Sequence, residues 1–165
     1  MIALTLPELK TATSCIFTKE TFDYFLVKEI TISTSNTFHV DGKLHPDYYT
    51  DEEKELLRDP VYSDWKSLRS FCFQLIKGKK LPQSFRLVFQ LSASNIEKFL
   101  KQYHLACQVS DIGGLYLHFR YENHTLSAVS GTSLNFFTMD KTIDMAWDEM
   151  VKRILKQAGI LFMES

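Results

Sequence analysis

The sequence has little cysteine and no long hydrophobic run. Its three cysteines, Cys15, Cys72 and Cys107, are far apart and never form a C-x-x-C pair. That pattern argues against a disulfide framework and against a structural zinc site. No apolar stretch approaches the ~20 residues that cross a bilayer, and the first residues lack the basic start of a signal peptide. We therefore expect a cytoplasmic protein that does not act at a membrane.

Neither sign of charge dominates. Nineteen basic residues stand against twenty acidic ones, which gives a formal net charge of -1. Such a chain has no overall field that attracts nucleic acid, so any binding of that kind needs a local patch. A glycine-rich phosphate loop is also absent, and no cysteine has an obvious base beside it. We therefore expect no cofactor and a binding protein rather than an enzyme.

The sequence does contain regular apolar periods. Hydrophobic residues make up 45% of its 165 residues, and 13 are Phe, enough for one compact domain over residues 1–165 that buries roughly 70% of the surface of the unfolded chain. Apolar and polar side chains alternate over residues 84–92, the pattern of a strand buried on one face. Stretches of helical period lie between such strands. The sequence predicts an α+β fold in which antiparallel sheet is covered by amphipathic helices.

The order of these elements divides the chain into four parts. Residues 1–49 and residues 81–139 each predict a strand, a helix and three strands, a β-α-β-β-β unit in which 126–130 and 133–138 are separate strands. Residues 50–80 predict a helical insert, and residues 140–165 a long helix with a tail that docks on its own core. The tail could also serve as a peptide for a partner.

Local motifs sharpen this outline. Asp41-Gly42 favours the type I′ turn of a hairpin, and Glu122-Asn123-His124 can supply another turn, because Asn tolerates positive φ. Capping boxes at Thr50 with Glu53 and at Ser94 with Glu97 predict two helix starts, and Asp148 with Lys152 predicts an ion pair on the last helix.

The two units also share a short match. Asn36-Thr-Phe-His-Val-Asp41 aligns with Asn135-Phe-Phe-Thr-Met-Asp140 through Asn, Phe and Asp. Together with the repeated order of elements, this favours an internal duplication, although so short a match also arises by chance.

The segment from Leu115 to Leu134 carries a resemblance. Its sequence, Leu-Tyr-Leu-His-Phe-Arg-Tyr-Glu-Asn-His-Thr-Leu-Ser-Ala-Val-Ser-Gly-Thr-Ser-Leu, is similar to the strand, turn, T-L-S and G-T-x-L pattern of bacterial DNA sliding clamp domains. The resemblance implies a clamp-like binding protein built from two β-α-β-β-β units, with Lys98 and Lys101 on a helix that faces DNA. The insert near residues 51–78 and the long final helix depart from that family, which puts ring assembly in doubt.

The whole chain resembles a family of uncharacterised small proteins from gut Firmicutes. The matching features are the opening strand, Thr37-Phe-His-Val-Asp-Gly42 with Tyr48 and Tyr49 beyond it, Phe71-Cys-Phe-Gln-Leu-Ile-Lys-Gly78, and Trp147-Asp-Glu-Met150. This resemblance implies a domain of unknown function and no particular activity.

Two sets of residues are candidates for a site. The first is a basic stripe with one aromatic residue, on one helix and its neighbours, that could meet phosphates; its members are Lys66, Arg69, Phe73, Lys77, Lys80, Arg86, Lys98 and Lys101. The alternative interpretation of this set is an ordinary solvated helix face. The second set is His39, Asp41 and His45, which could hold a divalent metal in a hydrolase. Its alternative interpretation is a turn with two exposed histidines.

These patterns leave three functions open. The preferred one is a non-catalytic binding or scaffold protein that binds a protein partner or self-associates, with nucleic acid as a further option. The second is the metal-dependent hydrolase. The third is a small-molecule binding protein with an apolar cavity under the helix at residues 143–158.

Overall fold

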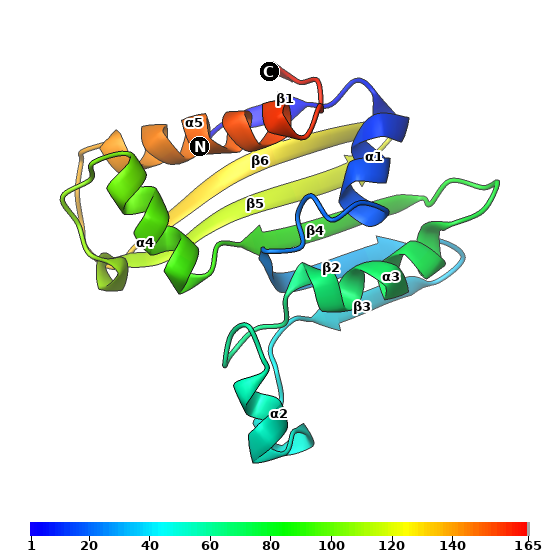
Figure 1. Cartoon of the computed structure of the whole chain (residues 1–165). Coiled ribbons are helices and arrows are strands. Elements are labelled where there is room, and N and C mark those ends of the chain that lie inside the picture. The colour runs from blue at the N-terminus through cyan, green and yellow to red at the C-terminus, as the bar shows by residue number, and fades with distance from the viewer. Residues whose placement is uncertain (165) are drawn as a thin grey trace.

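The computed structural model describes residues 1–164, and its strands form one antiparallel sheet (Figure 1). The order across the sheet is β3-β2-β4-β5-β6-β1-β7. The strands are β1 (Ala3–Thr5), β2 (Leu26–Ser33), β3 (Thr37–Asp41), β4 (Ser84–Gln90), β5 (Ile112–Glu122), β6 (Thr125–Leu134) and β7 (Met163–Glu164).

Four helices lie on one face of this sheet: α1 (Leu9–Phe17), α3 (Trp65–Ile76), α4 (Ala93–Gln102) and α5 (Thr142–Gln157) (Figure 1). The short helix α2 (Asp51–Glu55) stands away from the sheet beyond β3. Short 3-10 turns occupy Pro46–Tyr48 and Val109–Asp111. The prediction of an α+β fold with helix-covered antiparallel sheet is confirmed.

The core lies between the sheet and these four helices. Because the side chains of a strand alternate between its faces, Phe85, Leu87 and Phe89 of β4 all point into the core, where each is at most 3% exposed. The Phe89 ring packs against the Trp65 ring of α3 with centroids 5.0 Å apart. The Trp65 indole nitrogen donates to the carbonyl oxygen of Ile16 at 2.9 Å, so this one residue joins α3 to both α1 and β4.

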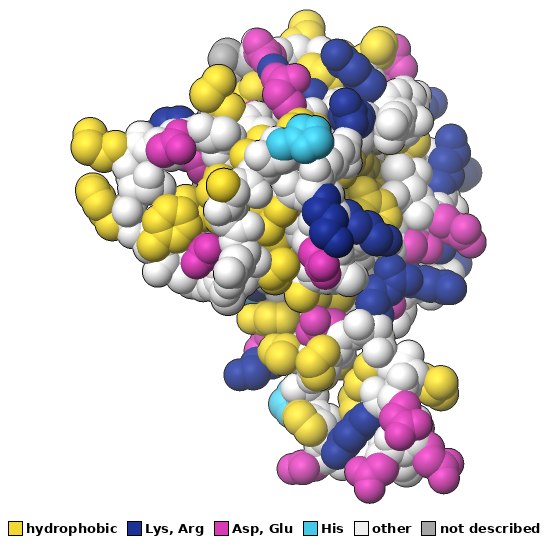
Figure 2. Space-filling model, turned by 60° about the vertical axis from the view of Figure 1, so that its left-hand side comes forward, with side chains coloured by type: hydrophobic (Ala, Val, Ile, Leu, Met, Phe, Trp, Pro, Cys, Tyr) yellow, Lys and Arg dark blue, Asp and Glu magenta, His cyan; other side chains and the backbone are white. Residues whose placement is uncertain are grey.

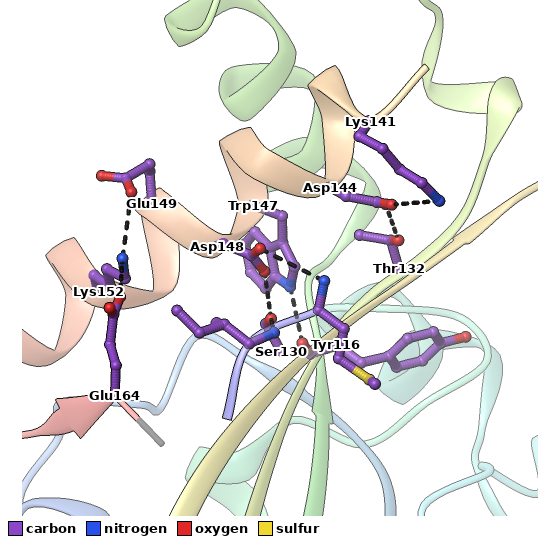
Figure 3. A network of polar contacts seen from close by, with 12 residues as sticks. Tyr116, Ser130, Thr132, Lys141, Asp144, Trp147, Asp148, Glu149, Lys152 and Glu164 are labelled. Atoms are coloured by element: carbon purple, nitrogen blue, oxygen red, sulfur yellow. Dashed lines mark hydrogen bonds and ion pairs between the residues drawn. The ribbon is translucent and has the colours of Figure 1, made fainter. Parts of the chain in front are cut away.

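Polar contacts fix α5 on β5 and β6 (Figure 3). The Trp147 indole nitrogen donates to the Tyr116 carbonyl oxygen at 2.8 Å, and Ser130 donates to Asp148 at 2.5 Å. Lys152 forms ion pairs with Glu149 and with Glu164 of β7. The predicted pair between Asp148 and Lys152 is wrong, because Asp148 faces the sheet while Lys152 faces the tail.

The predicted units need a correction, because each contributes three main strands instead of four. Residues 125–134 form a single strand, since Gly131 stays paired with Tyr116 and does not break the ladder. In addition, β1 pairs with β6 and β7, so that β4, β5 and β6 lie between β1 and β2 in the strand order. The two halves of the chain therefore interlock in one sheet and follow different paths. Residues 37–41 form β3, whereas residues 135–140 form a loop in which Phe137 is 92% exposed.

The local motifs had mixed outcomes. The capping box of Thr50 and Glu53 is confirmed, with both hydrogen bonds at 3.1 Å. Helix α4 instead begins two residues earlier than predicted, because Ser92, not Ser94, accepts a hydrogen bond from the backbone nitrogen of Asn95. The prediction of a type I′ turn at Asp41-Gly42 is wrong, because β3 pairs with the preceding strand β2 and Gly42 has no positive φ.

Candidate binding cleft

Three connections meet at one end of the sheet and enclose a cleft. They are the β2–β3 turn, the segment between α3 and β4, and the β5–β6 turn (Figure 1). The cleft has a volume of about 750 Å³, within the range of roughly 300–1,000 Å³ that is common for ligand sites. Its apolar lining comes from Leu75, Ile76, Leu81, Pro82 and Tyr121. Its polar lining comes from Thr34, Ser35, Lys77, Lys80, Gln83, Asn123 and His124.

The lysines of the cleft follow the end of α3. The backbone nitrogen of Lys77 donates to the Phe73 carbonyl oxygen at 2.9 Å and closes the last turn. Gly78 then has a φ of +128°, which only glycine adopts without strain. The chain therefore leaves the helix sharply and places Lys77, Lys79 and Lys80 beside its carboxyl end, where the helix dipole favours positive charge.

These three lysines have no acidic partner. Within the part of the chain that the structure describes, Lys77, Lys79 and Lys80 form no ion pair, and all three are exposed. No Asp or Glu lines the cleft. Positive charge over partly apolar walls raises the local concentration of anions.

The opposite wall is the turn between β5 and β6. Asn123 and His124 have φ values of 52° and 62°, as a two-residue type I′ turn requires, and Glu122 pairs with Thr125 on either side. The prediction of a turn at these residues is confirmed. Sequence reasoning missed that both residues line a cleft, because the turn chemistry does not reveal which segment the turn faces.

Arg69 and Phe73 of the predicted basic stripe have structural contacts. The Arg69 guanidinium donates two hydrogen bonds to the carboxylate of Asp23, at 2.7 and 3.1 Å. The bond to Asp23 raises the pKa of Arg69, and the pair ties α3 to the segment before β2. Phe73 is half-buried against the core. Neither side chain is free to bind a partner.

The other stripe residues are dispersed. Arg86 alternates with core residues of β4 and therefore lies on the uncovered face of the sheet, where it pairs with Glu29. Lys98 and Lys101 are exposed on α4, and Lys101 pairs with Glu97 at 3.3 Å. Lys66 is exposed at the start of α3. Of the eight predicted residues, only Lys77 and Lys80 line the cleft together.

The uncovered face of the sheet is a second polar surface. His118 lies on it opposite Val88 of β4 and Val129 of β6. Burial lowers the pKa of His118, and the charges of Arg86 and Lys28 lower it further, while Glu29 acts in the other direction. The Lys28 ammonium lies 4.9 Å from the centre of the Tyr116 ring. His118 therefore prefers to be neutral in the folded protein.

The proposed metal ligands do not converge. The Nδ1 atom of His39 shares a hydrogen bond with the Thr31 hydroxyl at 3.2 Å, and a carboxylate oxygen of Asp41 accepts from the backbone nitrogen of Lys43 at 3.0 Å. His45 belongs to the segment beyond β3. Among residues 1–164, no three His, Cys, Asp or Glu side chains lie together in a way that could hold a metal ion.

The buried side of α5 is filled by its own residues. Trp147, Val151 and Leu155 are fully buried, and the Trp147 ring packs edge-on against Phe99 of α4 at 5.8 Å. The open clefts beside α5 are lined by outward-facing residues such as Lys152 and Lys156. The tail docks on its own chain, since Ile160 is buried and β7 pairs with β1.

Comparison with known proteins identifies a family but no activity. The model of the family of unknown function DUF5721 matches residues 15–163. No curated protein and no solved structure matches the chain. Within residues 1–164, no helix has the length and apolar character that a membrane crossing needs.

Proposed function

Because the chain belongs to DUF5721, a family of unknown function, we propose its function from the geometry of the cleft alone. The protein is a non-catalytic binding protein, and its ligand is an anionic group with an apolar part. Lys77 and Lys80 hold the anionic group, and Leu75, Ile76 and Leu81 contact the apolar part.

One observation carries this proposal. Lysines without acidic partners gather around a cleft of about 750 Å³ whose walls include aliphatic and aromatic side chains. Several other cations of the surface are paired with acidic side chains, as Arg86 is with Glu29. A few placed polar groups over a partly apolar wall are typical of sites that bind small ligands or peptide side chains.

Binding of duplex DNA in the manner of a clamp is the alternative that the sequence resemblance suggests. A protein that binds duplex DNA chiefly through the phosphate backbone can make about six to ten phosphate contacts with Lys and Arg. The cleft offers Lys77 and Lys80, with Lys79 between them in the chain, whereas Lys98 and Lys101 stand on α4 near the other end of the sheet (Figure 1). The interlocked strand order also lacks the paired halves on which a clamp depends. We therefore favour a smaller anionic ligand.

The test uses anilinonaphthalene sulfonate, a fluorescent probe that combines aromatic rings with one anionic group. We expect the wild-type protein to bind this probe. The variant K77E/K80E should bind it more weakly, with a dissociation constant raised by about tenfold or more. The matched control K66E/K98E makes the same change of charge at two exposed lysines away from the cleft. Thermal melting of each variant verifies its fold.

The comparison between the two variants decides the outcome. If both bind the probe as tightly as the wild-type protein, the probe does not use the cleft lysines and the proposal is wrong. Equal weakening by both variants would also contradict it, because a general loss of positive charge would then explain the result.

A further inference from the structure

An acidic arm projects from the sheet next to β3. We define the acidic arm as residues 45–60, which contain a 3-10 turn and α2. It carries six acidic and two basic side chains. Figures 1 and 2 show that it stands away from the rest of the molecule, with acidic side chains gathered on it.

Part of this acidic charge has no partner. Within residues 1–164, Asp47, Glu52 and Glu55 make no ion pair or hydrogen bond through their carboxylates. The arm also exposes large apolar side chains, since Tyr48 is 83% and Leu56 86% exposed. Exposed aromatic and aliphatic side chains on a projecting segment are typical anchors of an interface.

The arm is nevertheless held in shape at its base and at its tip. At the base, the backbone nitrogen of Leu44 donates to the carbonyl oxygen of Val61 at 2.7 Å, and that of Ser63 donates to Gly42 at 2.9 Å. At the tip, the capping box of Thr50 and Glu53 closes the start of α2. A preformed segment loses less conformational entropy on binding than a disordered one.

The arm lies far from the cleft of its own chain. Gly42 at the base of the arm bonds to Lys28 near the start of β2, whereas Thr34, which lines the cleft, follows the end of β2. Six residues of strand separate these points by roughly 20 Å. A contact between arm and cleft therefore requires two molecules.

We propose that the acidic arm of one copy docks in the basic cleft of a second copy. The free carboxylates Asp47, Glu52 and Glu55 complement Lys77 and Lys80 of the cleft and the exposed Lys79 between them in the chain. Tyr48 and Leu56 complement the apolar wall. The inference rests on the proposed function, because it names the ligand of the same cleft.

The symmetry of this contact predicts its product. The arm and the cleft are different surfaces, so the contact is head-to-tail, and each added copy leaves one free arm and one free cleft. Short chains of molecules that lengthen with concentration are the expected product. Since the charged groups are exposed, the association weakens as salt increases.

Sedimentation velocity tests the inference with two neutralised variants. We expect wild-type protein to associate at low ionic strength and to dissociate in about 1 M salt, where the Debye length is about 3 Å. The arm variant E52Q/E55Q and the cleft variant K77Q/K80Q should each associate more weakly, with a dissociation constant raised by roughly tenfold. An equal mixture of the two should stop at a heterodimer, because it contains one working arm and one working cleft per pair.

A charge exchange and a matched control complete the design. The variant E52K/E55K/K77E/K80E exchanges the signs of both surfaces and should associate again, while K66Q/K98Q should behave as the wild-type protein. If the wild-type protein is monomeric up to about 1 mM, or if the charge exchange fails to restore association, the inference is wrong. Monomeric protein that still binds anilinonaphthalene sulfonate through Lys77 and Lys80 would leave the proposed function standing.

Discussion

A Cβ atom on Gly42 would lie 1.8 Å from the carbonyl oxygen of Val27. The chain passes this closely because the base of the acidic arm crosses the start of β2, where the backbone nitrogen of Gly42 donates to the Lys28 carbonyl oxygen at 3.0 Å. A β-bulge between Val27 and Glu29 lies at the same point. Gly42 is therefore required for the close approach of two backbones rather than for a turn.

The first prediction concerns this contact. Gly42→Ala should lower the free energy of unfolding by about 3 kcal/mol or more, because the new methyl group meets backbone that has no room to move aside. Urea unfolding measures the change. Gly159→Ala serves as a comparison, since a Cβ there meets nothing within 4 Å and the cost comes only from its positive φ. A smaller loss for Gly42→Ala than for Gly159→Ala would contradict the prediction.

The second prediction concerns the ion pair of Arg69 and Asp23. Both side chains are largely buried, so removing one partner leaves the other charge poorly solvated. We expect Asp23→Ala to lower the free energy of unfolding by about 2–3 kcal/mol, and the double variant D23A/R69A to lose less than the sum of the two single variants. Additive losses in this double-mutant cycle would show that the pair does not interact.

The third prediction concerns the β5–β6 turn. His124 has a φ of 62°, which glycine adopts at less cost than histidine. His124→Gly should therefore raise the free energy of unfolding by about 0.5–1 kcal/mol. His104→Gly gives a useful parallel, since His104 is exposed and has a φ of 52°. Thermal melting that shows lower stability for His124→Gly would mean that the imidazole makes contacts worth more than the strain.

The fourth prediction concerns His118 and pH. The folded protein lowers the pKa of His118, chiefly through burial, so the unfolded chain takes up this proton first as the pH falls. The contribution of the neutral imidazole to stability is present above the unfolded pKa of about 6.5. It is lost as the pH falls through that value and then through the lower pKa of the folded state.

Urea unfolding at several pH values tests this. Wild-type protein should lose more stability between about pH 7.5 and pH 5 than His118→Gln, because glutamine does not titrate. The difference between the two proteins isolates His118 from the other titrating groups. Parallel curves for the two proteins would show that His118 titrates alike in the folded and unfolded states.

Strands, helix caps and turns could be predicted where they depend on residues that are close together in the sequence. The alternation over residues 84–92, the capping box of Thr50 and the turn at Asn123 each depend on a few adjacent residues, and all three were found from the sequence. The choice between Ser92 and Ser94 as the cap of α4 was missed, since both serines offer a hydroxyl to the same helix start.

Long-range pairing could not be predicted in the same way. A strand of three residues such as β1 carries no signal for its partner, and its pairing with β6 depends on the arrangement of the whole sheet. The helical spacing of Lys66, Arg69 and Phe73 correctly placed them on one helix, α3. It could not show that Asp23 pairs with Arg69. The cleft could not be predicted from the sequence, because its walls come from three connections that are far apart in the chain.

The sequence by itself determined most of the segments that form strands and helices, because hydrophobic period, caps and turn residues act over a few neighbouring positions. It also determined that the protein carries balanced charge, and that lysines gather after α3 and acids around α2. Only the tertiary structure decided that these two charged segments lie at opposite ends of one sheet, since strand order is set by the packing of the whole core. That separation prevents the arm from meeting its own cleft and leaves both surfaces open to other molecules.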